Sequence, residues 1–442
     1  MDSLFGTSGI RAEASFFTEQ FCFDMGRTFA LFLKAHQTDG KVAVGRDPRL
    51  SGQNILNFYS SGLIYERKEV HSMGIVPIPA LNYFLKKDPS FGAATMVTGS
   101  HVKETMNGLK FFFLGEEISK EEEKEIMAIY EKIKNQVSFK DGTEKILSSD
   151  SAIGFYENLL WEIADKPYPS WKVVVDPGNG AWTGFAVKLL SRFGLTTVGL
   201  NNSLDLSFIS RDTEQDGVFK DLQMAVVEQK ADLGIAFDAD GDRVVFIDEK
   251  GNFIPGDYSC SLIAGNSSSS TIVTPVGSSQ VVDSLGKKVI RCQVGSPFVI
   301  KAMKENNSLF GFEANGGGIS GEIMFTRDGG TTMVKMLNTL KKHGGPLSSL
   351  VAILPRYFQF RTKVDCPRES NQKVLTLAEK EFSGKRIEKI DGLKIWVNES
   401  SWILFRPSNN APEFRIFSEA KTKTEAENLG QKGVDFVKMV IK

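Results

Sequence analysis

The sequence predicts an α/β fold built from repeated strand–loop–helix units. Short apolar runs rich in β-branched residues, at 41–44, 171–175 and 271–275, are each followed by a loop that contains glycine. Stretches with helical periodicity lie between such runs. Because strands that alternate with helices tend to form parallel sheets covered on both faces, this order favours three related α/β units.

Two of the helical stretches carry recognisable start signals. Residues 16–36 form one of them, and Thr18 is its expected N-cap. Residues 119–135 form the other, in which Ser119 and Glu122 have the spacing of a capping box. Both are expected to be amphipathic helices that cover a sheet.

The pattern changes near Pro355 and Pro367, where we expect the last domain boundary. Beyond it the chain is β-rich and ends in a helix after Thr424. This composition predicts a smaller α+β domain, whose strands are expected at residues 357–364, 393–396, 402–406 and 414–418.

Composition limits the classes of partner. The 442 residues are 41% hydrophobic and 24% charged with a formal net charge of −1, so neither nucleic acid nor an acidic membrane is expected as a partner. No apolar run approaches the ~20 residues that span a bilayer, and the N-terminus has no signal-peptide pattern. The expected location is cytoplasmic. The cysteines lack metal-ligand spacing and are expected to be reduced core thiols: Cys22, Cys260, Cys292 and Cys366.

An acidic loop lies between apolar runs at residues 233–237 and 244–247. It carries Asp238, Asp240 and Asp242, whose carboxylates repel one another unless a cation lies among them. Oxygen ligands favour a hard ion, and Mg²⁺ is the usual one beside phosphate. The loop is therefore a predicted Mg²⁺ site.

Two further residues of this loop indicate phosphate chemistry. Gly241 permits the turn, and Arg243 offers a fixed cation to a phosphate oxygen. A calcium loop of the EF-hand type is excluded, because its sixth position must be glycine and is Arg243 here. A polar surface hairpin, and a phosphatase in which Asp238 is itself the nucleophile, stay open on the local sequence.

A second loop presents a serine. A β-run ends at residues 98–101, which read Thr-Gly-Ser-His, and Asn107-Gly108 is a hairpin-turn signal before the next strand at 109–113. Ser100 is thus expected in a loop between two strands, with Lys110 able to fold back towards it. An ordinary loop hydroxyl fits equally well, and the adjacent histidine does not make a catalytic triad.

With both loops present, the chain resembles the α-D-phosphohexomutases, which move a phosphoryl group between the 1- and 6-positions of a hexose phosphate. The resemblance runs nearly end to end. Its other landmarks follow the family's order: Phe5-Gly6-Thr7-Ser8-Gly9-Ile10-Arg11, Val44-Gly45-Arg46-Asp47-Pro48-Arg49-Leu50-Ser51-Gly52, Gly251 with Pro255-Gly256-Asp257, Gly311-Phe312-Glu313-Ala314-Asn315-Gly316-Gly317, and Arg406-Pro407-Ser408-Asn409-Asn410-Ala411-Pro412-Glu413-Phe414-Arg415.

The resemblance implies a role for each candidate site residue. Ser100 resembles the phosphoserine, and its phosphoryl oxygen would join Asp238, Asp240 and Asp242 as a Mg²⁺ ligand. The groups implied around the transferring phosphoryl group are Arg11, His101, Lys110 and Arg243. The sugar loop would bind ring hydroxyls through Glu313 and Asn315. The loop implied to hold the other phosphate contributes Arg406, Ser408, Asn409, Asn410 and Arg415.

The chain departs from the family at several positions. Val102-Lys103 stands where Asn-Pro is usual, and Gly99 replaces the commoner alanine. In the sugar loop Asn315 takes the place of serine and Gly317 that of a frequent histidine. Residues 205–220 lack the proline-rich segment that is common before the metal loop. Without a sugar-loop histidine, proton transfer would fall to a lysine or histidine of the serine loop region, a carboxylate or water.

The resemblance implies three related α/β domains with mixed sheets and a C-terminal α+β domain around a central cleft. We expect the serine loop in domain 1–146 and the Mg²⁺ loop in domain 147–250. The sugar loop is expected in domain 251–360, and the phosphate-binding loop in domain 361–442. Rotation of the last domain would open the cleft.

The implied activity is that of a phosphohexomutase, an isomerase of carbohydrate metabolism. It would interconvert hexose 6-phosphate and hexose 1-phosphate through a phosphoserine enzyme and a hexose 1,6-bisphosphate, with mannose preferred and glucose accepted. Phosphoglucosamine mutase, phosphoglucomutase and a non-catalytic sugar-phosphate binder stay open. The implied cofactors are Mg²⁺ and a hexose 1,6-bisphosphate activator, and the partners are small hexose phosphates. A monomer or homodimer is expected.

Overall fold

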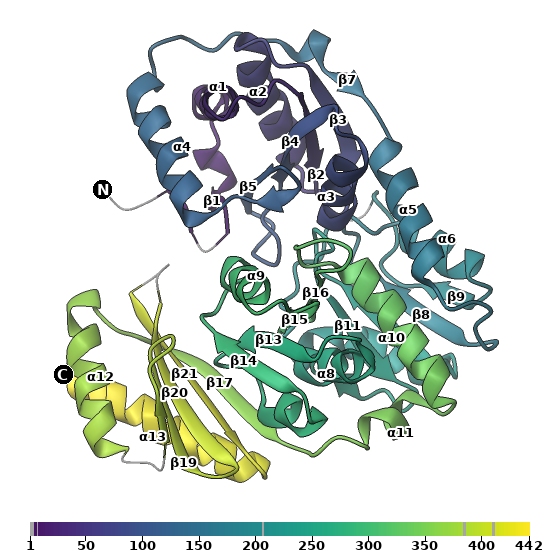
Figure 1. Ribbon diagram of the computed structural model, residues 1–442, viewed down its shortest axis with the longest axis vertical. Helices are drawn as coiled ribbons and strands as arrows, with labels where there is room; N and C mark the ends of the chain where they lie inside the picture. The colour runs from purple at the N-terminus through teal and green to yellow at the C-terminus, as the bar shows by residue number, and fades with distance from the viewer. Residues whose placement is uncertain (1–3, 7, 206, 383–385, 409–411) are drawn as a thin grey trace.

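The computed structural model describes residues 4–6, 8–205, 207–382, 386–408 and 412–442. Within these ranges the chain forms four β-sheets in sequence order, each with its own helices (Figure 1). None of the helices in this part of the chain is both long enough and apolar enough to cross a lipid bilayer.

The first sheet is mixed, with the strand order β1-β5-β4-β2-β3-β7 and β6 beside β5. Strands β3 and β4 flank β2 in parallel, and β5 reverses direction beside β4. Its strands are β1 (Ile10–Glu13), β2 (Lys41–Arg46), β3 (Val70–Ile75), β4 (Phe91–Val97), β5 (Met106–Phe113), β6 (Glu116–Glu117) and β7 (Leu147–Ser148). Its helices are α1 (Glu19–Ala35), α2 (Gly52–Tyr65), α3 (Ile78–Lys87) and α4 (Lys120–Ile133).

Both predicted helix starts are confirmed. The Thr18 side chain accepts a hydrogen bond from the Phe21 amide and caps α1. The helix therefore begins after Thr18 rather than at residue 16, because an extended cap residue ends the short 3-10 turn before it. Ser119 and Glu122 form the reciprocal capping box of α4.

The second and third sheets are smaller and also mixed. Their orders are β12-β11-β10-β8-β9 and β14-β13-β15-β16. The second contains β8 (Lys172–Asp176), β9 (Thr196–Gly199), β10 (Leu233–Phe237), β11 (Val244–Asp248) and β12 (Phe253–Ile254), with α5 (Ser151–Ile163), α6 (Phe185–Arg192) and α7 (Lys220–Glu228). The third contains β13 (Thr271–Pro275), β14 (Lys288–Cys292), β15 (Phe310–Glu313) and β16 (Gly317–Ser320), with α8 (Gly256–Asn266), α9 (Ser296–Glu305), α10 (Gly329–His343) and α11 (Leu347–Val351).

One topology repeats in these three sheets. Strands β2, β8 and β13 each lie between two parallel neighbours. In each sheet one of those neighbours then turns back into an antiparallel strand, which gives the pairs β4–β5, β10–β11 and β15–β16. The prediction of three related α/β units is confirmed, and the reversing loop is the equivalent part of each.

The fourth sheet is antiparallel throughout, in the order β17-β21-β20-β19-β18. It forms the C-terminal α+β domain (lower left in Figure 1). Its strands are β17 (Phe358–Asp365), β18 (Arg386–Glu388), β19 (Leu393–Asn398), β20 (Ser401–Pro407) and β21 (Glu413–Ala420), with helices α12 (Asn371–Glu381) and α13 (Lys423–Ile441). Helix α12 and strand β18 were not predicted.

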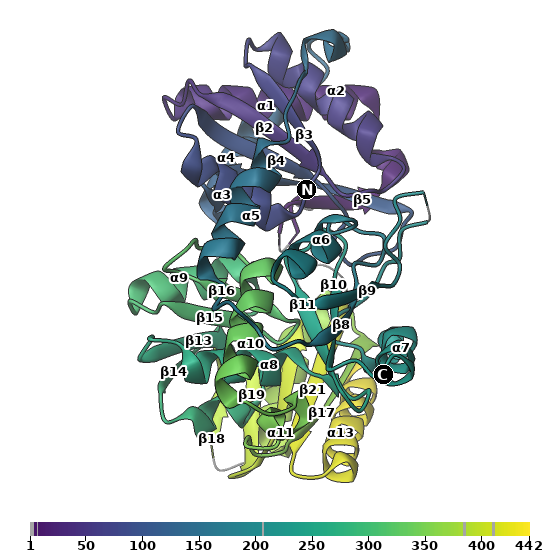
Figure 2. The ribbon, with the colours of Figure 1, turned by 90° about the vertical axis from the view of Figure 1, so that its right-hand side faces the viewer.

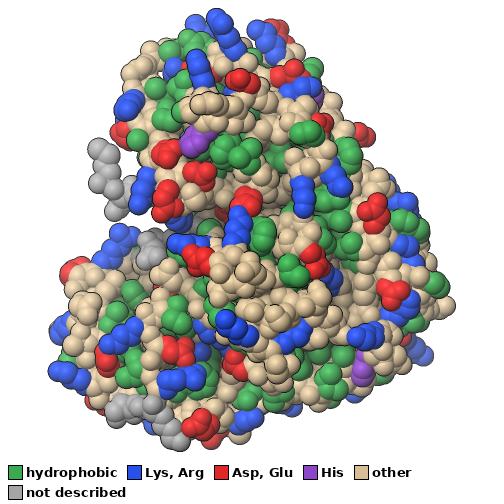
Figure 3. Space-filling view, in the orientation of Figure 1, with side chains coloured by type: hydrophobic (Ala, Val, Ile, Leu, Met, Phe, Trp, Pro, Cys, Tyr) green, Lys and Arg blue, Asp and Glu red, His purple; other side chains and the backbone are tan. Residues whose placement is uncertain are grey.

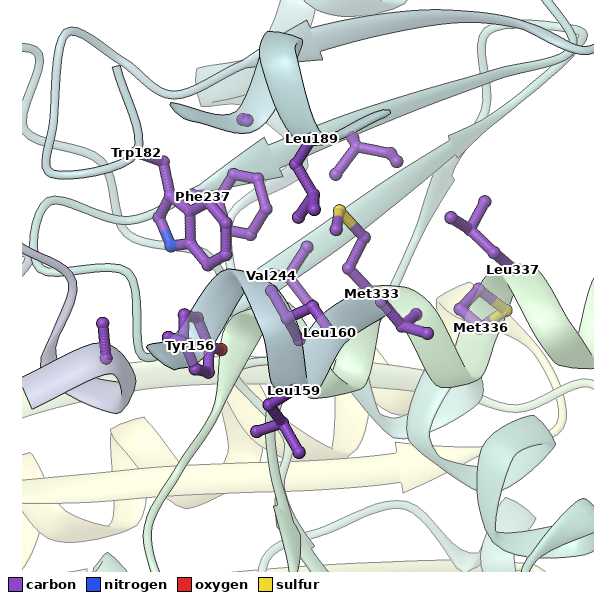
Figure 4. Close-up of a cluster of buried hydrophobic side chains, with 14 of the residues drawn as sticks. Tyr156, Leu159, Leu160, Trp182, Leu189, Phe237, Val244, Met333, Met336 and Leu337 are labelled. Carbon is purple, nitrogen blue, oxygen red and sulfur yellow. The ribbon is translucent and has the colours of Figure 1, made fainter. Parts of the chain in front are cut away.

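The three α/β units share one apolar core, whereas the C-terminal domain has a core of its own. Helix α5 contacts α3 of the first unit and α10 of the third (Figures 1 and 2). At the centre Trp182 stacks on Phe237 with ring centroids 4.3 Å apart, near Tyr156 and Met333 (Figure 4). This shared packing gives the reversing loops of the three units a common rigid support.

One predicted turn is wrong. Asn107 and Gly108 lie inside β5, where they pair with β1, and do not form a hairpin turn. The Asn107 side-chain amide donates to Ser51 Oγ at 2.9 Å. A Cβ at Gly108 would lie 2.5 Å from the Ile10 carbonyl oxygen, so this glycine serves close backbone approach.

The domain boundaries at residues 146, 250 and 360 stay a prediction. Strand β7 pairs with β3, β12 pairs with β11, and β17 begins at Phe358. A division by sheets would therefore move each boundary by a few residues.

Candidate active site

The three carboxylates of the acidic loop converge between β10 and β11. Asp238, Asp240 and Asp242 each offer an oxygen within 4.8 Å of the others, and all three side chains are buried. Gly241 has φ +70°, a left-handed conformation that favours glycine. A Cβ there would lie 2.2 Å from Trp182 Nε1, which donates to the Gly241 carbonyl at 3.2 Å. The apolar core thus holds the turn of this loop in place.

The charges of this loop are unevenly matched. Burial, and then the Asp240 and Asp242 carboxylates, raise the pKa of Asp238 well above its ordinary value. Burial also opposes ionisation of Asp240, but the Lys110 ammonium and Arg243 lower the pKa of that carboxyl below its ordinary value. Lys110 Nζ lies 2.7 Å from Asp240 Oδ2. A divalent cation would relieve the remaining repulsion.

The donor set fits Mg²⁺. Asp240 Oδ1 and Asp242 Oδ1 are buried and accept no hydrogen bond from the described residues. The second oxygen of Asp240 accepts a hydrogen bond from Lys110, and the second oxygen of Asp242 accepts one from Arg327 Nη2 at 2.7 Å. The orphaned acceptors are all carboxylate oxygens, which are the ligands of a hard cation. These residues would hold Mg²⁺.

The serine of the first unit lies against this loop. Ser100 Oγ is 3.4 Å from Asp238 Oδ2, although the two residues are 138 positions apart in the chain. Its φ of +54° is in the left-handed region, which costs a non-glycine residue about 1–3 kcal/mol. The Ser100 amide donates to Thr98 Oγ1 at 2.8 Å. The surrounding structure must therefore impose this conformation.

Arg49 supplies much of that constraint. Its guanidinium donates to the carbonyl oxygens of Ser100 at 2.6 Å and Val102 at 2.8 Å through Nη2. Through Nη1 it donates to those of Lys103 at 2.6 Å and Met106 at 3.0 Å. The Arg49 side chain is fully buried and paired with Asp47 at 3.0 Å. One arginine therefore gathers the carbonyl groups of the serine loop.

The departure at Gly99 is part of the same arrangement. A Cβ at Gly99 would lie 2.7 Å from Arg49 Cζ, so an alanine would force the guanidinium to move. The glycine at position 99 thus leaves the space that the buried Arg49 guanidinium occupies.

The cations expected around the serine gather on the same side of the metal loop. Arg243 Nε lies 3.7 Å from Asp238 Oδ2 and 3.6 Å from Asp242 Oδ1, and makes no hydrogen bond to the described residues. This buried donor fits a phosphate oxygen. Arg11, on β1, is close enough to this group that burial together with Arg243 lowers its pKa, against the attraction of Asp240.

His101 is the other neighbour of the serine. Its Nδ1 lies 3.4 Å from Ser100 Oγ. The nearby Arg243 guanidinium, followed by burial, lowers the pKa of His101 to about 2. The imidazole is therefore neutral near pH 7 and weakly basic, which suits a hydrogen-bonding role better than that of a general base.

The sugar loop joins the metal loop from the third unit. Glu313 ends β15 and is buried, and its Oε2 accepts from Arg327 Nη1 at 3.0 Å. Asn315 Oδ1 accepts from the Gly317 amide at 3.0 Å, so the asparagine shapes its own loop. The Val244 amide, at the start of β11, donates to the Gly316 carbonyl at 3.3 Å. The structure thus places Glu313 beside the metal loop.

The last predicted loop lies at the ends of β20 and β21. Arg406 and Arg415 are paired across these strands, and the Ser408 amide donates to the Glu413 carbonyl at 2.8 Å. Arg406 Nε donates to Asp391 Oδ2 at 2.5 Å. Asn409 and Asn410 lie outside the described residues. Figure 3 shows the surface hollowed between this domain and the first unit, with lysine and arginine side chains along its rim.

Three contributors to the site were missed by the sequence analysis. Arg327 bridges the metal and sugar loops, and Arg49 holds the serine loop. Residues 207–213 join the serine loop to the sugar loop. Arg49 belongs to the family landmark at residues 44–52, but the sequence alone indicated no role for its side chain. Arg327 directly precedes Asp328, the N-cap of α10. Because the partners of these residues come from distant parts of the chain, local patterns did not reveal them.

Family models match most of the chain. They are described as phosphoglucomutase/phosphomannomutase alpha/beta/alpha domain I over residues 2–137, domain II over 155–251 and domain III over 255–357.

Full-length relatives agree with these matches. The phosphoglucomutase/phosphomannomutase of Thermococcus kodakarensis is 34% identical over 467 aligned positions, with 100% of both chains covered. The phosphoglucosamine mutase of Bacillus subtilis is 31% identical, with 99% of each chain covered.

Solved structures show the same fold. A phosphoglucomutase/phosphomannomutase family protein of Burkholderia thailandensis superposes with a TM-score of 0.83 at 22% identity, covering 100% of this chain and 98% of the other. The N-acetylphosphoglucosamine mutase of Aspergillus fumigatus, solved in complex with GlcNAc-6P and magnesium, superposes with a TM-score of 0.64 at 14% identity, covering 99% and 96%.

Proposed function

The chain belongs to the phosphoglucomutase/phosphomannomutase family, whose members are phosphomutases, and we propose that it interconverts hexose 6-phosphates and hexose 1-phosphates. One observation carries this proposal: Ser100 Oγ lies 3.4 Å from Asp238 in a loop of three buried carboxylates. A hydroxyl next to a predicted Mg²⁺ site is the expected arrangement for a phosphoserine that donates and accepts a phosphoryl group.

In the proposed reaction, phospho-Ser100 transfers its phosphoryl group to the free 1- or 6-hydroxyl of the sugar phosphate. The hydroxyl oxygen forms the new P–O bond, the Ser100 Oγ–P bond breaks, and the hydroxyl proton passes to Ser100 Oγ by way of water. The resulting hexose 1,6-bisphosphate reorients in the cleft. Its other phosphoryl group then returns to Ser100, with the reverse proton movement.

The residues around the reacting phosphorus are proposed to act by charge and position. Mg²⁺ bound by the three aspartates would neutralise charge on the transferring phosphoryl group. Arg243, Arg11 and Lys110 would add fixed positive charge on the same side. Glu313 would bind ring hydroxyls. The non-reacting phosphate would be held by Arg406, Ser408, Asn409, Asn410 and Arg415.

The proposed substrate is mannose phosphate, with glucose phosphate also accepted. Gly99 and Asn315 support this preference through the resemblance described above. Glucosamine phosphate is the second candidate, because the relative from Bacillus subtilis bears that name at 31% identity. The reaction is proposed to start with a hexose 1,6-bisphosphate activator, which would phosphorylate Ser100.

A coupled assay with the 1-phosphates of mannose, glucose and glucosamine, with Mg²⁺ and a 1,6-bisphosphate, tests class and substrate together. We expect turnover of at least one sugar, loss of activity in Ser100→Ala, and loss on chelation of Mg²⁺. Intact-mass analysis should show one added phosphate on the wild type and none on Ser100→Ala. Full activity of that variant, or stable phosphate on an aspartate, would contradict the proposal in favour of a phosphatase. Sugar-phosphate binding without turnover would indicate a non-catalytic binder.

A further inference from the structure

The two loops proposed to bind Mg²⁺ and sugar are connected by one arginine. Arg327 Nη2 donates to Asp242 Oδ2 at 2.7 Å, and its Nη1 donates to Glu313 Oε2 at 3.0 Å. The arginine is buried, and so are both carboxylates. Burial opposes its charge, but Asp242 and Glu313 outweigh burial and raise the pKa of Arg327 above its ordinary value. The Arg327 guanidinium is therefore charged near pH 7.

Arg327 occupies the space of the missing sugar-loop side chain. A Cβ at Gly317 would lie 2.6 Å from Arg327 Cδ and 3.0 Å from its Cγ. No side chain can therefore be accommodated at position 317 while Arg327 keeps its place. The family often has histidine at position 317. Here a glycine at that position is what leaves room for the Arg327 side chain.

The backbone fixes the arginine from both sides. Arg327 forms a β-bridge with Ile319 of β16, and the Asp328 amide donates to the Gly318 carbonyl at 2.9 Å. Asp328 caps α10, accepts from the Thr331 amide at 2.8 Å and also accepts from the Tyr156 hydroxyl. The backbone at Arg327 is thus anchored to the shared core, so its side chain reaches the two carboxylates from a fixed origin.

The bridge occupies one oxygen of each carboxylate. It occupies Asp242 Oδ2 and leaves Asp242 Oδ1 without a hydrogen bond from the described residues. On Glu313 it occupies Oε2. A forked guanidinium, unlike an ammonium, can bind two acceptors in fixed directions.

We propose that Arg327 is a positioning residue, which replaces the absent side chain at position 317 and holds the metal-binding Asp242 and the sugar-binding Glu313 in register. This role rests on the proposed function, since it assigns Mg²⁺ and hexose phosphate to the two loops. Because Arg327 cannot give up a proton, it acts through orientation and charge rather than as a substitute acid or base.

The first test compares wild type with Arg327→Lys, which keeps the charge and removes the fork. We expect kcat/KM to fall about 10- to 100-fold, the loss of roughly one or two charge-assisted hydrogen bonds. Both the KM for sugar phosphate and the Mg²⁺ concentration for half-maximal activity should rise. Arg192→Lys, at an exposed ion pair with Glu157, is the matched control and should change neither. A folded Arg327→Lys variant with unchanged sugar and Mg²⁺ dependence would overturn the proposal.

The second test uses the glycine. Gly317→Ala should displace Arg327 and reproduce both effects, whereas Gly154→Ala, where a Cβ meets nothing within 4 Å, should not. In Gly317→Ala/Arg327→Ala the clash with Arg327 is gone and only the 3.0 Å approach of the new Cβ to Asn315 Oδ1 stays, so the double variant should be little worse than Arg327→Ala. If the kinetic effects of Gly317→Ala and Arg327→Ala were additive in the double variant, a side chain at position 317 and Arg327 would not compete for the same space.

Binding measurements distinguish a failure of this inference from a failure of the proposed function. Calorimetry with Mg²⁺ and with mannose 1-phosphate measures both sites without turnover. If the wild type binds both but catalyses nothing, the mutase proposal fails, while weaker binding of both ligands to Arg327→Lys still supports the bridge. If only one ligand is affected, the bridging role is wrong.

Discussion

At the scale of single residues, the backbone conformation of Ser100 is held by contacts rather than by its own preference. Ser100 adopts a left-handed φ of +54°, and the buried Arg49 binds four carbonyl groups between Ser100 and Met106. Carbonyl groups that face one charged donor cannot reorient independently. Arg49 therefore couples the conformation of Ser100 to that of the whole loop.

Arg49→Lys tests this dependence. An ammonium cannot reach all four carbonyl groups, so the serine loop should relax towards unstrained backbone. We expect kcat to fall about 10- to 100-fold, the loss of roughly one or two hydrogen bonds to a charged group. The phosphate found on Ser100 by intact-mass analysis should also decrease. Arg67→Lys, at an exposed residue just beyond α2, is the control, and equal kcat and phosphorylation in both variants would refute the role of Arg49.

At the scale of elements, a segment of the second unit joins the serine and sugar loops. Ser210 Oγ donates to the carbonyl oxygens of His101 at 2.8 Å and Val102 at 2.7 Å. Thr213 Oγ1 donates to the Asn315 carbonyl at 2.8 Å. Residues 207–213 therefore act as a brace between loops of the first and third units, in the region where the proline-rich segment of the family is missing.

Ser210→Ala and Thr213→Val separate the two ends of this brace. Each removes about 1 kcal/mol of hydrogen bonding, so we expect changes of about 3- to 10-fold. Ser210→Ala should lower kcat, because it loosens the serine loop. Thr213→Val should mainly raise the KM for sugar phosphate. Ser268→Ala, at an exposed serine outside residues 207–213, is the control, and identical kinetic changes in the two test variants would argue against separate roles.

At the scale of the whole molecule, the C-terminal domain is attached differently from the others. The three α/β units share a core, but the last domain meets the third unit through a separate apolar cluster of Val276, Trp396, Trp402 and Leu404, beside which polar groups also pair across the interface. Ser100 is completely buried in this arrangement. Because the C-terminal domain has a core of its own, we expect it to move relative to the three α/β units when sugar phosphate enters.

A lysine is buried in this contact. Lys394 Nζ donates to the Val276 carbonyl at 2.9 Å and lies 4.0 Å from the centre of the Trp402 ring. Burial, followed by repulsion from Arg291, lowers the pKa of Lys394 to about 7. In the unfolded chain a lysine has a pKa of about 10.4, so the unfolded state binds more protons between pH 7 and 10. The penalty for burying this charge is complete below pH 7 and is relieved as the pH rises.

Lys394→Met should remove this pH dependence. The free energy of unfolding of the wild type, relative to the variant, should increase from pH 7 to pH 10 by at most about 1.4 kcal/mol per pH unit. Chemical denaturation followed by tryptophan fluorescence measures it, since Trp396 and Trp402 lie in the contact. Lys389→Met, at an exposed lysine, is the control. A difference that does not vary with pH would show that Lys394 stays charged.

Local patterns in the sequence were sufficient to predict the parts of the site that lie within one turn of the chain. Asp238, Asp240 and Asp242 alternate over five positions, so their convergence needs no distant residue, and this cluster of carboxylates could be predicted. The strand and helix periods likewise predicted the repeated α/β units and the α+β end of the chain. The Asn107-Gly108 turn failed because pairing with β1 overrode a local preference.

The tertiary structure alone decided which loops face one another. Ser100 and Asp238 are 138 positions apart, and the chain brings them together only by packing three sheets on one core. Long side chains reach across loops in directions that no spacing encodes, so the contacts of Arg49 and Arg327 could not be predicted. The sequence by itself determined which chemical groups this protein has and the local turns that present them; packing determined that they form one site, because contact between distant segments depends on the whole fold.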